Sequence, residues 1–389
     1  MQPLDVMSIF GTRPEAIKMA PLVKAMEQDP RIFSKVCVTA QHREMLDGVL
    51  SLFDIHPWRD LNIMQHGQTI TDITVHTLTG LQAVMKEARP DYILVHGDTT
   101  TTFVASLAAF YEKIPIGHVE AGLRTGNIYS PYPEEMNRRL TGTLATLHFA
   151  PTWQNRDMLL KENIAADHIF VTGNTVIDAL LSVIKKGYDF QDPLLNKLAA
   201  EARIHPLLVM TCHRRENWGK PMEQIFEAVK TLARRYPKYR VIYPVHLNPA
   251  IGELAQNMLG QESNIFLIEP LDYAPFANLL DAADLILTDS GGIQEEAPVL
   301  GKPILVMRTE TERPEAVAAG TVQVVGVETD AIVKAAAALL DDPVAYETMA
   351  RAINPYGDGN ASKRIIEALV YTSGRTTHKP TEWAFNNQG

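Results

Sequence analysis

The sequence lacks the motifs of several common metal and redox sites. It has two cysteines in 389 residues, Cys37 and Cys212, and neither a Cys-x-x-Cys nor a His-Glu-x-x-His motif, so it gives no support for a zinc site. Cys37 lies in the apolar run 36–38, where we expect a buried, unreactive thiol. No Gly-x-Gly-x-x-Gly follows the first predicted strand, which disfavours a nicotinamide cofactor. We therefore expect neither a metal ion nor an organic cofactor.

Long apolar runs and a basic surface are also lacking. No window offers about 18 continuous apolar residues, and no basic segment followed by a long apolar run opens the chain, so we expect no membrane association and a cytoplasmic location. There are 36 basic and 46 acidic residues, giving a net charge of -10. This balance argues against a broad nucleic-acid surface, which needs clustered Lys and Arg. A nucleotide ligand stays compatible, because it needs only a few local basic groups.

The pattern of apolar runs predicts an α/β fold. The length suits two domains, and short apolar runs alternate with amphipathic stretches along most of the chain. Most runs are continuous, as expected for parallel strands buried on both faces, so the alternation predicts two Rossmann-like, doubly wound parallel sheets. The expected strands are residues 6–10, 35–39, 92–95, 115–119, 169–171, 207–211, 241–245, 265–268, 285–287, 303–306 and 322–325.

The domain boundary is expected where this alternation pauses, in the polar and turn-rich residues 185–205. We expect an N-terminal domain of residues 1–185 and a C-terminal domain of residues 186–365. The carboxyl ends of their strands would line an interdomain cleft, where ligands bind in folds of this type. The last helix, residues 361–371, is expected to pack back on the N-terminal domain, and the polar tail, residues 372–389, to be loosely ordered.

Residues 286–298 carry the most informative local pattern. An apolar strand runs into the turn Ser290–Gly291–Gly292, and a helix-compatible segment containing Glu296 follows. The unpaired amides of such a helix start suit a phosphate, and a carboxylate one turn later can accept hydrogen bonds from ribose hydroxyls. The segment predicts a nucleotide-diphosphate pocket, the alternative being a glycine turn with ordinary helix capping.

Polar side chains follow several predicted strands of the first half. Arg13 and Lys18 bracket a helix start, so both can approach a pyrophosphate, unless this is only a solvated helix entrance. Asp98 either caps the next helix or belongs to a polar pocket. Glu120 ends a buried strand, where a carboxylate is costly unless it is paired or used. A structural ion pair with Arg124 is the alternative there.

Similar clusters follow further along the chain. Glu134 opens a helix, where it suits the helix dipole or pairs with Arg138 one turn later, unless it serves a site. His213 follows a strand and is flanked by arginines, so it can act as a general acid or base or neutralise a phosphate. His246 follows the next strand in the same way, and Arg313 is expected at the rim of the cleft.

Taken in order, these motifs resemble those of the non-hydrolysing UDP-N-acetylglucosamine 2-epimerases. The matching segments span residues 8–365, which is nearly the whole chain. The segments are F-G-T-R-P-E-A-I-K-M-A-P, T-A-Q-H-R-E-M-L-D, H-G-D-T-T-T-T, H-V-E-A-G-L-R-T, P-E-E-M-N-R, G-N-T-V-I-D-A-L, H-R-R-E-N, Y-P-V-H-L-N-P, T-D-S-G-G-I-Q-E-E-A-P, E-R-P-E-A and N-P-Y-G-D-G.

The resemblance implies a GT-B-like pair of Rossmann-like domains, a homodimer, and interconversion of UDP-GlcNAc and UDP-ManNAc without a metal or a nicotinamide. It implies that Phe276 lies near the uracil, that Leu271 contacts the base partly through its main chain, and that His213 lies near the diphosphate. The other implied UDP-binding positions are Arg13, Ser290, Gly291, Gly292, Glu296 and Arg313. The implied sugar-side and catalytic positions are Lys18, Asp98, Glu120 and Glu134.

Some bacterial members of this family also bind UDP-GlcNAc at a second, activating site. The matching regions of this chain include Gln41, Gln68, Arg214 and His246. Members with this site can carry arginine in the region where this chain has His66-Gly67, and this departure leaves allosteric activation open.

The chemistry implied by the resemblance explains the residue types. The C2 proton of the sugar is not acidic, so inversion without a redox cofactor needs elimination of UDP to a glucal and re-addition. The diphosphate then needs cationic groups and amides, and the ring needs proton-transfer groups on both faces. The product would supply ManNAc units for cell-surface polysaccharides. The alternatives are a GT-B glycosyltransferase with a UDP-sugar donor, a hydrolysing epimerase, and a nucleotide-sugar sensor without activity.

Overall fold

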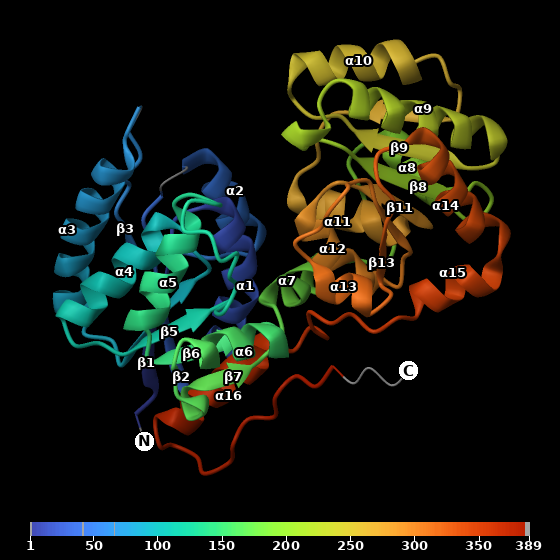
Figure 1. The fold of residues 1–389 in the computed structure, drawn as a ribbon. Helices are drawn as coiled ribbons and strands as arrows, with labels where there is room; N and C mark the ends of the chain where they lie inside the picture. The colour runs from blue at the N-terminus through green and yellow to red at the C-terminus, as the bar shows by residue number, and fades with distance from the viewer. Residues whose placement is uncertain (1, 41–42, 66, 386–389) are drawn as a thin grey trace. The chain divides into compact units, whose positions relative to one another are not determined.

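The chain forms two compact α/β units (Figure 1). The structure is a computed structural model that describes residues 2–40, 43–65 and 67–385. The first unit comprises Met1–Ser182 and Tyr356–Ala384, and the second is built on Val183–Pro355. Each unit has one doubly wound parallel sheet, which confirms the expected GT-B-like α/β fold class, whereas the interdomain cleft stays a prediction.

The sheet of the first unit has seven strands in the described part of the chain, in the order β3-β2-β1-β4-β5-β6-β7, and all its ladders are parallel. The strands are β1 (Leu4–Phe10), β2 (Ile32–Val38), β3 (Arg59–Asp60), β4 (Tyr92–His96), β5 (Ile116–Val119), β6 (Leu147–Ala150) and β7 (Ile169–Val171). The helices are α1 (Arg13–Gln28), α2 (Arg43–Leu52), α3 (Ile70–Ala88), α4 (Thr100–Tyr111), α5 (Glu134–Leu144), α6 (Trp153–Lys161), α7 (Thr175–Val183) and α16 (Ala361–Thr372).

The sheet of the second unit has six strands among the described residues, in the order β10-β9-β8-β11-β12-β13, again with parallel ladders. The strands are β8 (Leu207–Thr211), β9 (Arg240–Pro244), β10 (Ile265–Ile268), β11 (Leu285–Thr288), β12 (Ile304–Val306) and β13 (Val322–Val324). The helices are α8 (Pro193–Ala200), α9 (Lys220–Arg235), α10 (Pro249–Leu259), α11 (Tyr273–Ala282), α12 (Gly291–Glu296), α13 (Pro314–Ala318), α14 (Thr329–Asp341) and α15 (Pro343–Ala350).

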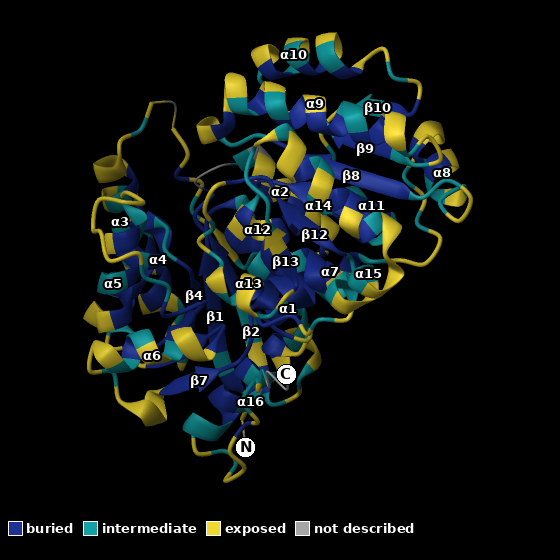
Figure 2. Ribbon diagram, turned by 45° about the vertical axis from the view of Figure 1, so that its right-hand side comes forward, coloured by how far each residue is buried: buried dark blue, intermediate teal, exposed yellow. Residues whose placement is uncertain are grey.

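Burial on both faces explains why the strands are continuous apolar runs. The central strands β1, β4 and β8 are coloured almost wholly as buried in Figure 2. Cys37 of β2 is fully buried, as expected, and burial raises the pKa of its thiol to about 12. No helix in the part of the chain that the structure describes is both long and apolar enough to cross a membrane.

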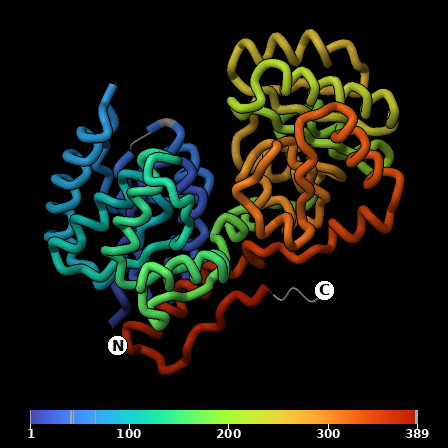
Figure 3. The backbone as a smooth tube through the Cα atoms, in the orientation of Figure 1, coloured from blue at the N-terminus to red at the C-terminus, as the bar shows by residue number. Residues whose placement is uncertain are grey.

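The first unit is discontinuous in sequence, as the trace in Figure 3 shows. The chain passes to the second unit after Ser182 and returns at Tyr356, so residues 356–360, which we placed in the C-terminal domain, belong to the first unit together with the helix that we expected to pack back on it. The polar segment expected as a linker contains helix α8. Helix α16 packs on α1, and its first turn is held by Asp178, which accepts a hydrogen bond from Ser362 N at 2.8 Å.

Two residues of the tail expected to be loosely ordered, Glu382 and Trp383, are hydrogen-bonded at the edge of the first sheet. Trp383 N donates to Val171 O at 2.7 Å, and Val171 N donates to Glu382 Oε1 at 3.1 Å. The indole of Trp153 donates to Trp383 O at 2.9 Å. Strand β7 is an edge strand, so its backbone groups need such partners. Polar composition does not reveal which edge strand a tail can pair with, so these contacts at residues 382–383 could not be predicted from the sequence.

Candidate functional site

Glu120 lies at the centre of a charged cluster at the carboxyl end of the first sheet. It follows β5 directly and is 8% exposed. Lys18 Nζ donates to both carboxylate oxygens, at 2.7 and 2.8 Å. His96 Nε2 lies 2.8 Å from Glu120 Oε2, and Asn174 Nδ2 donates to Oε1 at 3.3 Å. The alternative ion pair with Arg124 is not formed, because that guanidinium pairs with Glu162.

This cluster fixes the charge of Glu120. Burial alone would raise the pKa of this carboxyl, but the charges and hydrogen bonds of Lys18 and His96 outweigh burial and hold the pKa well below its ordinary value. The backbone of Glu120 is left-handed, with a φ of 62°, which costs roughly 1–2 kcal/mol for a residue that is not glycine. A strained residue with an ionised, enclosed carboxylate is a candidate proton acceptor.

Asp98, after β4, lies in a different environment. It is partly buried, Arg138 Nη2 donates to its Oδ2 at 2.5 Å, and Asn137 Nδ2 donates to its carbonyl at 3.0 Å. Burial raises the pKa of Asp98, the nearby charge of Glu120 adds to this, and Arg138 opposes it. Two carboxyls on neighbouring strands therefore have pKa values shifted in opposite directions, an arrangement suited to acid and base roles.

Glu134 is the first residue of α5 and is partly exposed. The expected alternative, an ion pair with Arg138, is not formed, because Arg138 bonds to Asp98 and lies 3.4 Å from Glu135. Glu135 has a structural role. It is fully buried and accepts a hydrogen bond from Thr125 N at 3.0 Å.

The turn after β1 brings Arg13 to the start of α1, with Lys18 about one and a half helical turns further on. Position 11 of this turn has no room for a side chain, so it requires glycine. A Cβ on Gly11 would lie 2.0 Å from Thr39 Oγ1 and 2.8 Å from Thr101 Oγ1. The close approach packs the turn against the ends of β2 and α4.

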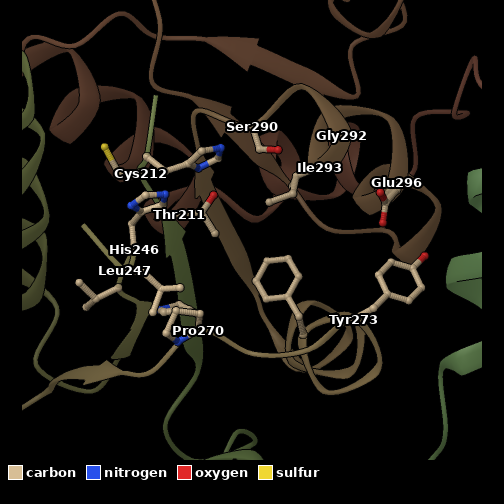
Figure 4. A pocket seen from close by; sticks show the side chains of 14 residues that line it. Thr211, Cys212, His246, Leu247, Pro270, Tyr273, Ser290, Gly292, Ile293 and Glu296 are labelled. Carbon is tan, nitrogen blue, oxygen red and sulfur yellow. The ribbon is translucent and has the colours of Figure 1, made fainter. Parts of the chain in front are cut away.

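The second unit contains a pocket of about 370 Å³ (Figure 4). It lies at the carboxyl ends of β8, β9 and β11, where ligands bind in doubly wound sheets. The rings of His213 and His246 stack in its wall, with centroids 6.2 Å apart and planes 9° apart. The lining residues are Thr211, Cys212, His213, Pro244, Val245, His246, Leu247, Pro270, Tyr273, Phe276, Ser290, Gly292, Ile293 and Glu296.

Asp289 orients His213 at the pocket wall. Asp289 is fully buried, and its Oδ2 accepts hydrogen bonds from the backbone N–H groups of His213 and Arg214, both at 2.8 Å. His213 Nδ1 lies 3.1 Å from Asp289 Oδ1, and Asn217 Nδ2 donates to Oδ2 at 3.2 Å. Burial alone would raise the pKa of the Asp289 carboxyl, but the side chain of His213 and the backbone hydrogen bonds from His213 and Arg214 outweigh burial and hold this pKa below its ordinary value. His213 is thereby held with Nε2 free of this carboxylate.

The glycine turn begins helix α12, as the sequence indicated. Ser290 is the N-cap residue, its side chain makes no capping hydrogen bond, and Gly291 and Gly292 form the first turn. Their amides belong to the helix start, whose N–H groups have no partner within the helix. Glu296 lies one turn later, and its carboxylate and the Tyr273 hydroxyl point toward one another in Figure 4. Burial and the charge of Glu296 raise the pKa of Tyr273 well above its ordinary value.

Four of the expected UDP-binding residues are not among the residues that line this pocket: Arg13, which belongs to the first unit, and Leu271, Gly291 and Arg313. Arg313 bonds to Glu295, although its Nη2 would lie 4.0 Å from a Cβ on Gly291. Arg214 Nη2 would lie 3.4 Å from the same Cβ, so both guanidinium groups approach the glycine turn. Pro270, the residue before Leu271, lines the pocket.

The residues expected at the activating site are distributed over both units. Gln68, in the first unit, accepts a hydrogen bond from Gln65 N at 3.2 Å before helix α3. Arg214 and His246 belong to the second unit. Gln41 and His66 lie outside the described residues.

Sequence reasoning did not single out Glu15, His96, Asn174, Tyr273 or Asp289. Two of them could have been found: Glu15 forms a capping-box pattern with Thr12, and Asp289 directly follows a predicted strand. His96 and Asn174 carried none beyond their places at strand ends. No group of three or more His, Cys, Asp or Glu side chains able to hold a metal ion occurs among the described residues.

Comparison with known proteins gives matches along nearly the whole chain. A family model described as UDP-N-acetylglucosamine 2-epimerase matches residues 24–370. The UDP-N-acetylglucosamine 2-epimerase of Escherichia coli O157:H7 is 57% identical over 370 residues, covering 94% of this chain and 98% of the relative. That of Bacillus subtilis strain 168 is 53% identical over 380 residues, covering 98% of each. The crystal structure of UDP-GlcNAc 2-epimerase from Neisseria meningitidis bound to UDP-GlcNAc has a TM-score of 0.81 at 51% identity, covering 94% of this chain and 100% of that chain.

Proposed function

The chain belongs to the UDP-N-acetylglucosamine 2-epimerase family, and from this premise we propose that it interconverts UDP-GlcNAc and UDP-ManNAc by eliminating and re-adding UDP. The C2 proton has no adjacent carbonyl to acidify it. Elimination avoids this barrier: the C1–O bond breaks with its electron pair leaving on UDP, a carboxylate takes the C2 proton, and the former C2–H pair becomes the C1=C2 double bond of the glucal. Re-addition of UDP with protonation of C2 from the other face inverts the centre.

The leaving diphosphate is assigned to the pocket of the second unit. Its developing charge needs donors that are already in place. The first-turn amides of α12 and His213, held by Asp289, supply such donors in this proposal, and Arg13 and Arg313 supply positive charge. The apolar ring of Phe276 suits the uracil, and the Glu296 carboxylate suits ribose hydroxyls.

The proton transfers are assigned to the first unit. The observation that carries this proposal is the enclosed cluster of Glu120 with Lys18 and His96, beside an Asp98 whose pKa is shifted the other way. Glu120 is ionised and suited to accept a proton, and Asp98 is suited to donate one. The roles exchange in the reverse direction. Glu134 is the third candidate, since its carboxylate is partly exposed at the start of α5.

Two broader expectations accompany this assignment. The family resemblance supports a homodimer and a product that supplies ManNAc units to cell-surface polysaccharide synthesis. Retention of the reactive glucal favours closure of the enzyme on UDP during turnover.

Incubation of the protein with UDP-GlcNAc alone in deuterated water tests the proposal. We expect UDP-ManNAc carrying deuterium at C2, together with trace glucal and UDP in quenched samples. UDP-ManNAc that retains the original C2 hydrogen would overturn the elimination mechanism. Free ManNAc with UDP would indicate a hydrolysing enzyme. No product without an added acceptor would indicate a glycosyltransferase or a sensor.

A further inference from the structure

Glu15 joins two turns of the first sheet through one buried carboxylate. It is the third residue of α1 and is 2% exposed. Its Oε2 accepts hydrogen bonds from Gly11 N at 3.1 Å, Thr12 N at 2.8 Å and Thr12 Oγ1 at 2.8 Å. Its Oε1 accepts from Thr99 Oγ1 at 2.7 Å, and Thr102 Oγ1 lies 3.0 Å from the same oxygen. One oxygen therefore serves the turn after β1 and the other serves the turn after β4.

The Thr102 hydroxyl has one hydrogen and two acceptors for it. The His96 carbonyl lies 2.6 Å from Thr102 Oγ1, closer than Glu15 Oε1. Thr99 Oγ1 accepts from Thr102 N at 3.1 Å, so its own hydrogen is available to Glu15. The hydrogen bond that the Thr99 hydroxyl donates therefore connects Glu15 to the turn after β4.

The carboxylate is held by uncharged donors. No ion pair of Glu15 with a basic side chain occurs within the part of the chain that the structure describes. The positive end of the α1 dipole and the hydrogen bonds compensate its burial instead. A glutamine of the same shape would direct an NH₂ group either at the Gly11 and Thr12 backbone N–H groups, which cannot accept, or at the Thr99 hydroxyl, which would then have to turn its hydrogen away.

The two turns that Glu15 joins carry groups of the proposed reaction. Arg13 follows Thr12, and Asp98 precedes Thr99. An ordinary capping box needs only the contacts to the helix start. The box at α3 shows the contrast: Asp72 accepts from Thr69 N at 2.8 Å and from Thr69 Oγ1 at 2.7 Å, in an exposed position and with no second turn attached.

We propose that Glu15 is a positioning residue that fixes the spacing of Arg13 and Asp98 by tying their turns together, a role that rests on the proposed epimerase reaction. It does not touch the substrate. It sets the distance between a group that binds the diphosphate and a group that transfers a proton, where a displacement of about 1 Å can cost roughly 100-fold in rate.

Glu15→Gln and Glu15→Asp test this role with UDP-GlcNAc as substrate. We expect both variants to lower kcat by roughly 10- to 100-fold with a smaller change in KM. Aspartate keeps the charge and the helix-start contacts but is too short to reach Thr99, so restored turnover in Glu15→Asp would overturn the proposal. The matched control is Asp72→Asn, which we expect to lower Tm and leave kcat unchanged.

Thr99→Val breaks the same link from the other side, so the test does not depend on the stability of the Glu15 variants. We expect Glu15→Gln to lower kcat by a smaller factor in the Thr99→Val background than in the wild type, because the two substitutions remove the same hydrogen bond. Additive losses, or a Glu15→Gln kcat near wild type per folded molecule, would overturn the positioning role. A wild-type protein that makes no UDP-ManNAc would instead reject the proposed function, and this role with it.

Discussion

Lys18 and Glu120 stand 102 residues apart in sequence, and the Lys18 ammonium contacts both oxygens of the Glu120 carboxylate, at 2.7 and 2.8 Å. The contact joins the second turn of α1 to the end of β5. Because Glu120 is buried, its ionised state depends on this cation and on His96. The pair therefore links the stability of the first unit to the chemistry proposed for it.

Replacing Lys18 with methionine removes that cation while keeping the length of the side chain. We expect the pKa of Glu120 to rise, the acidic limb of the kcat–pH profile to move to higher pH, and turnover at neutral pH to fall on the order of 100-fold. Lys24→Met on the same helix is the control, since Lys24 pairs with Glu27 at the surface. An unchanged pH profile in Lys18→Met would contradict the proposed role of the pair.

The same shift predicts how acid affects stability. The folded-state pKa of Glu120 is depressed, so its ionised form contributes stability above its ordinary value of 4.5, and this contribution is lost as the pH falls through the folded-state value. Unfolding of the wild type followed from pH 6 down to about pH 3 should therefore show a loss of stability that is smaller in Glu120→Gln. If the wild type and Glu120→Gln lost equal stability over this pH range, Glu120 would not be a source of the acid-induced loss.

Asp98→Asn should separate activity from stability. The folded-state pKa of Asp98 is raised, so the fold favours its neutral form, and the stability linked to this shift is lost as the pH rises through the folded-state value. At neutral pH the variant should have a higher Tm than the wild type and a turnover that is ~100- to 10,000-fold lower. Turnover near that of the wild type, measured as UDP-ManNAc formation, would remove Asp98 from the acid/base assignment.

Asp289→Asn should weaken the pocket of the second unit. The amide would face backbone N–H donors of His213 and Arg214, leaving at least one donor without a partner at a cost of roughly 1–3 kcal/mol in the free energy of unfolding. We expect weaker UDP binding by calorimetry as well. Asp284→Asn is the matched control: this aspartate accepts from Leu207 N at 2.8 Å at the opposite end of the same strands, so UDP affinity should not change. Equal effects on affinity would refute the positioning of His213 by Asp289.

Gly11→Ala tests the packing of the turn after β1. The added Cβ would overlap the Thr39 hydroxyl, so we expect a loss of ~1–3 kcal/mol in the free energy of unfolding. Gly48→Ala is the control, because Gly48 is exposed in α2 and a Cβ there meets nothing within 4 Å. This second change should stabilise the protein by about 0.5–1 kcal/mol. Chemical denaturation of both variants provides the measurement.

The sequence predicted the fold class because continuous apolar runs are a local signal. It missed β3 and β6. Strand β3 has only two residues, both exposed, and β6 contains His148, whose ring is buried in its neutral form because burial lowers its pKa to about 4. We expected the chain to return to the first unit with the helix that begins at residue 361, whereas the return begins at Tyr356, because the segment before this helix has no periodic pattern.

The candidate site was predictable where it follows strand ends. Asp98, Glu120 and His213 directly follow or lie close to the ends of β4, β5 and β8, where parallel sheets carry their ligands. The partners that set their properties were not predictable. Lys18 and Asp289 come from other strands and helices, and the Arg138 interaction with Asp98 replaced the local pairing with Glu134 that helical spacing suggested.

The discontinuity of the first unit has a consequence for biosynthesis. Helix α16 cannot dock on α1 until the ribosome has translated residues 361–372, whereas the strands and helices of the second unit are all encoded before residue 351. The first unit therefore stays incomplete until translation is nearly over, although its synthesis begins first. The second unit, which is encoded in the middle of the chain, can finish folding before it.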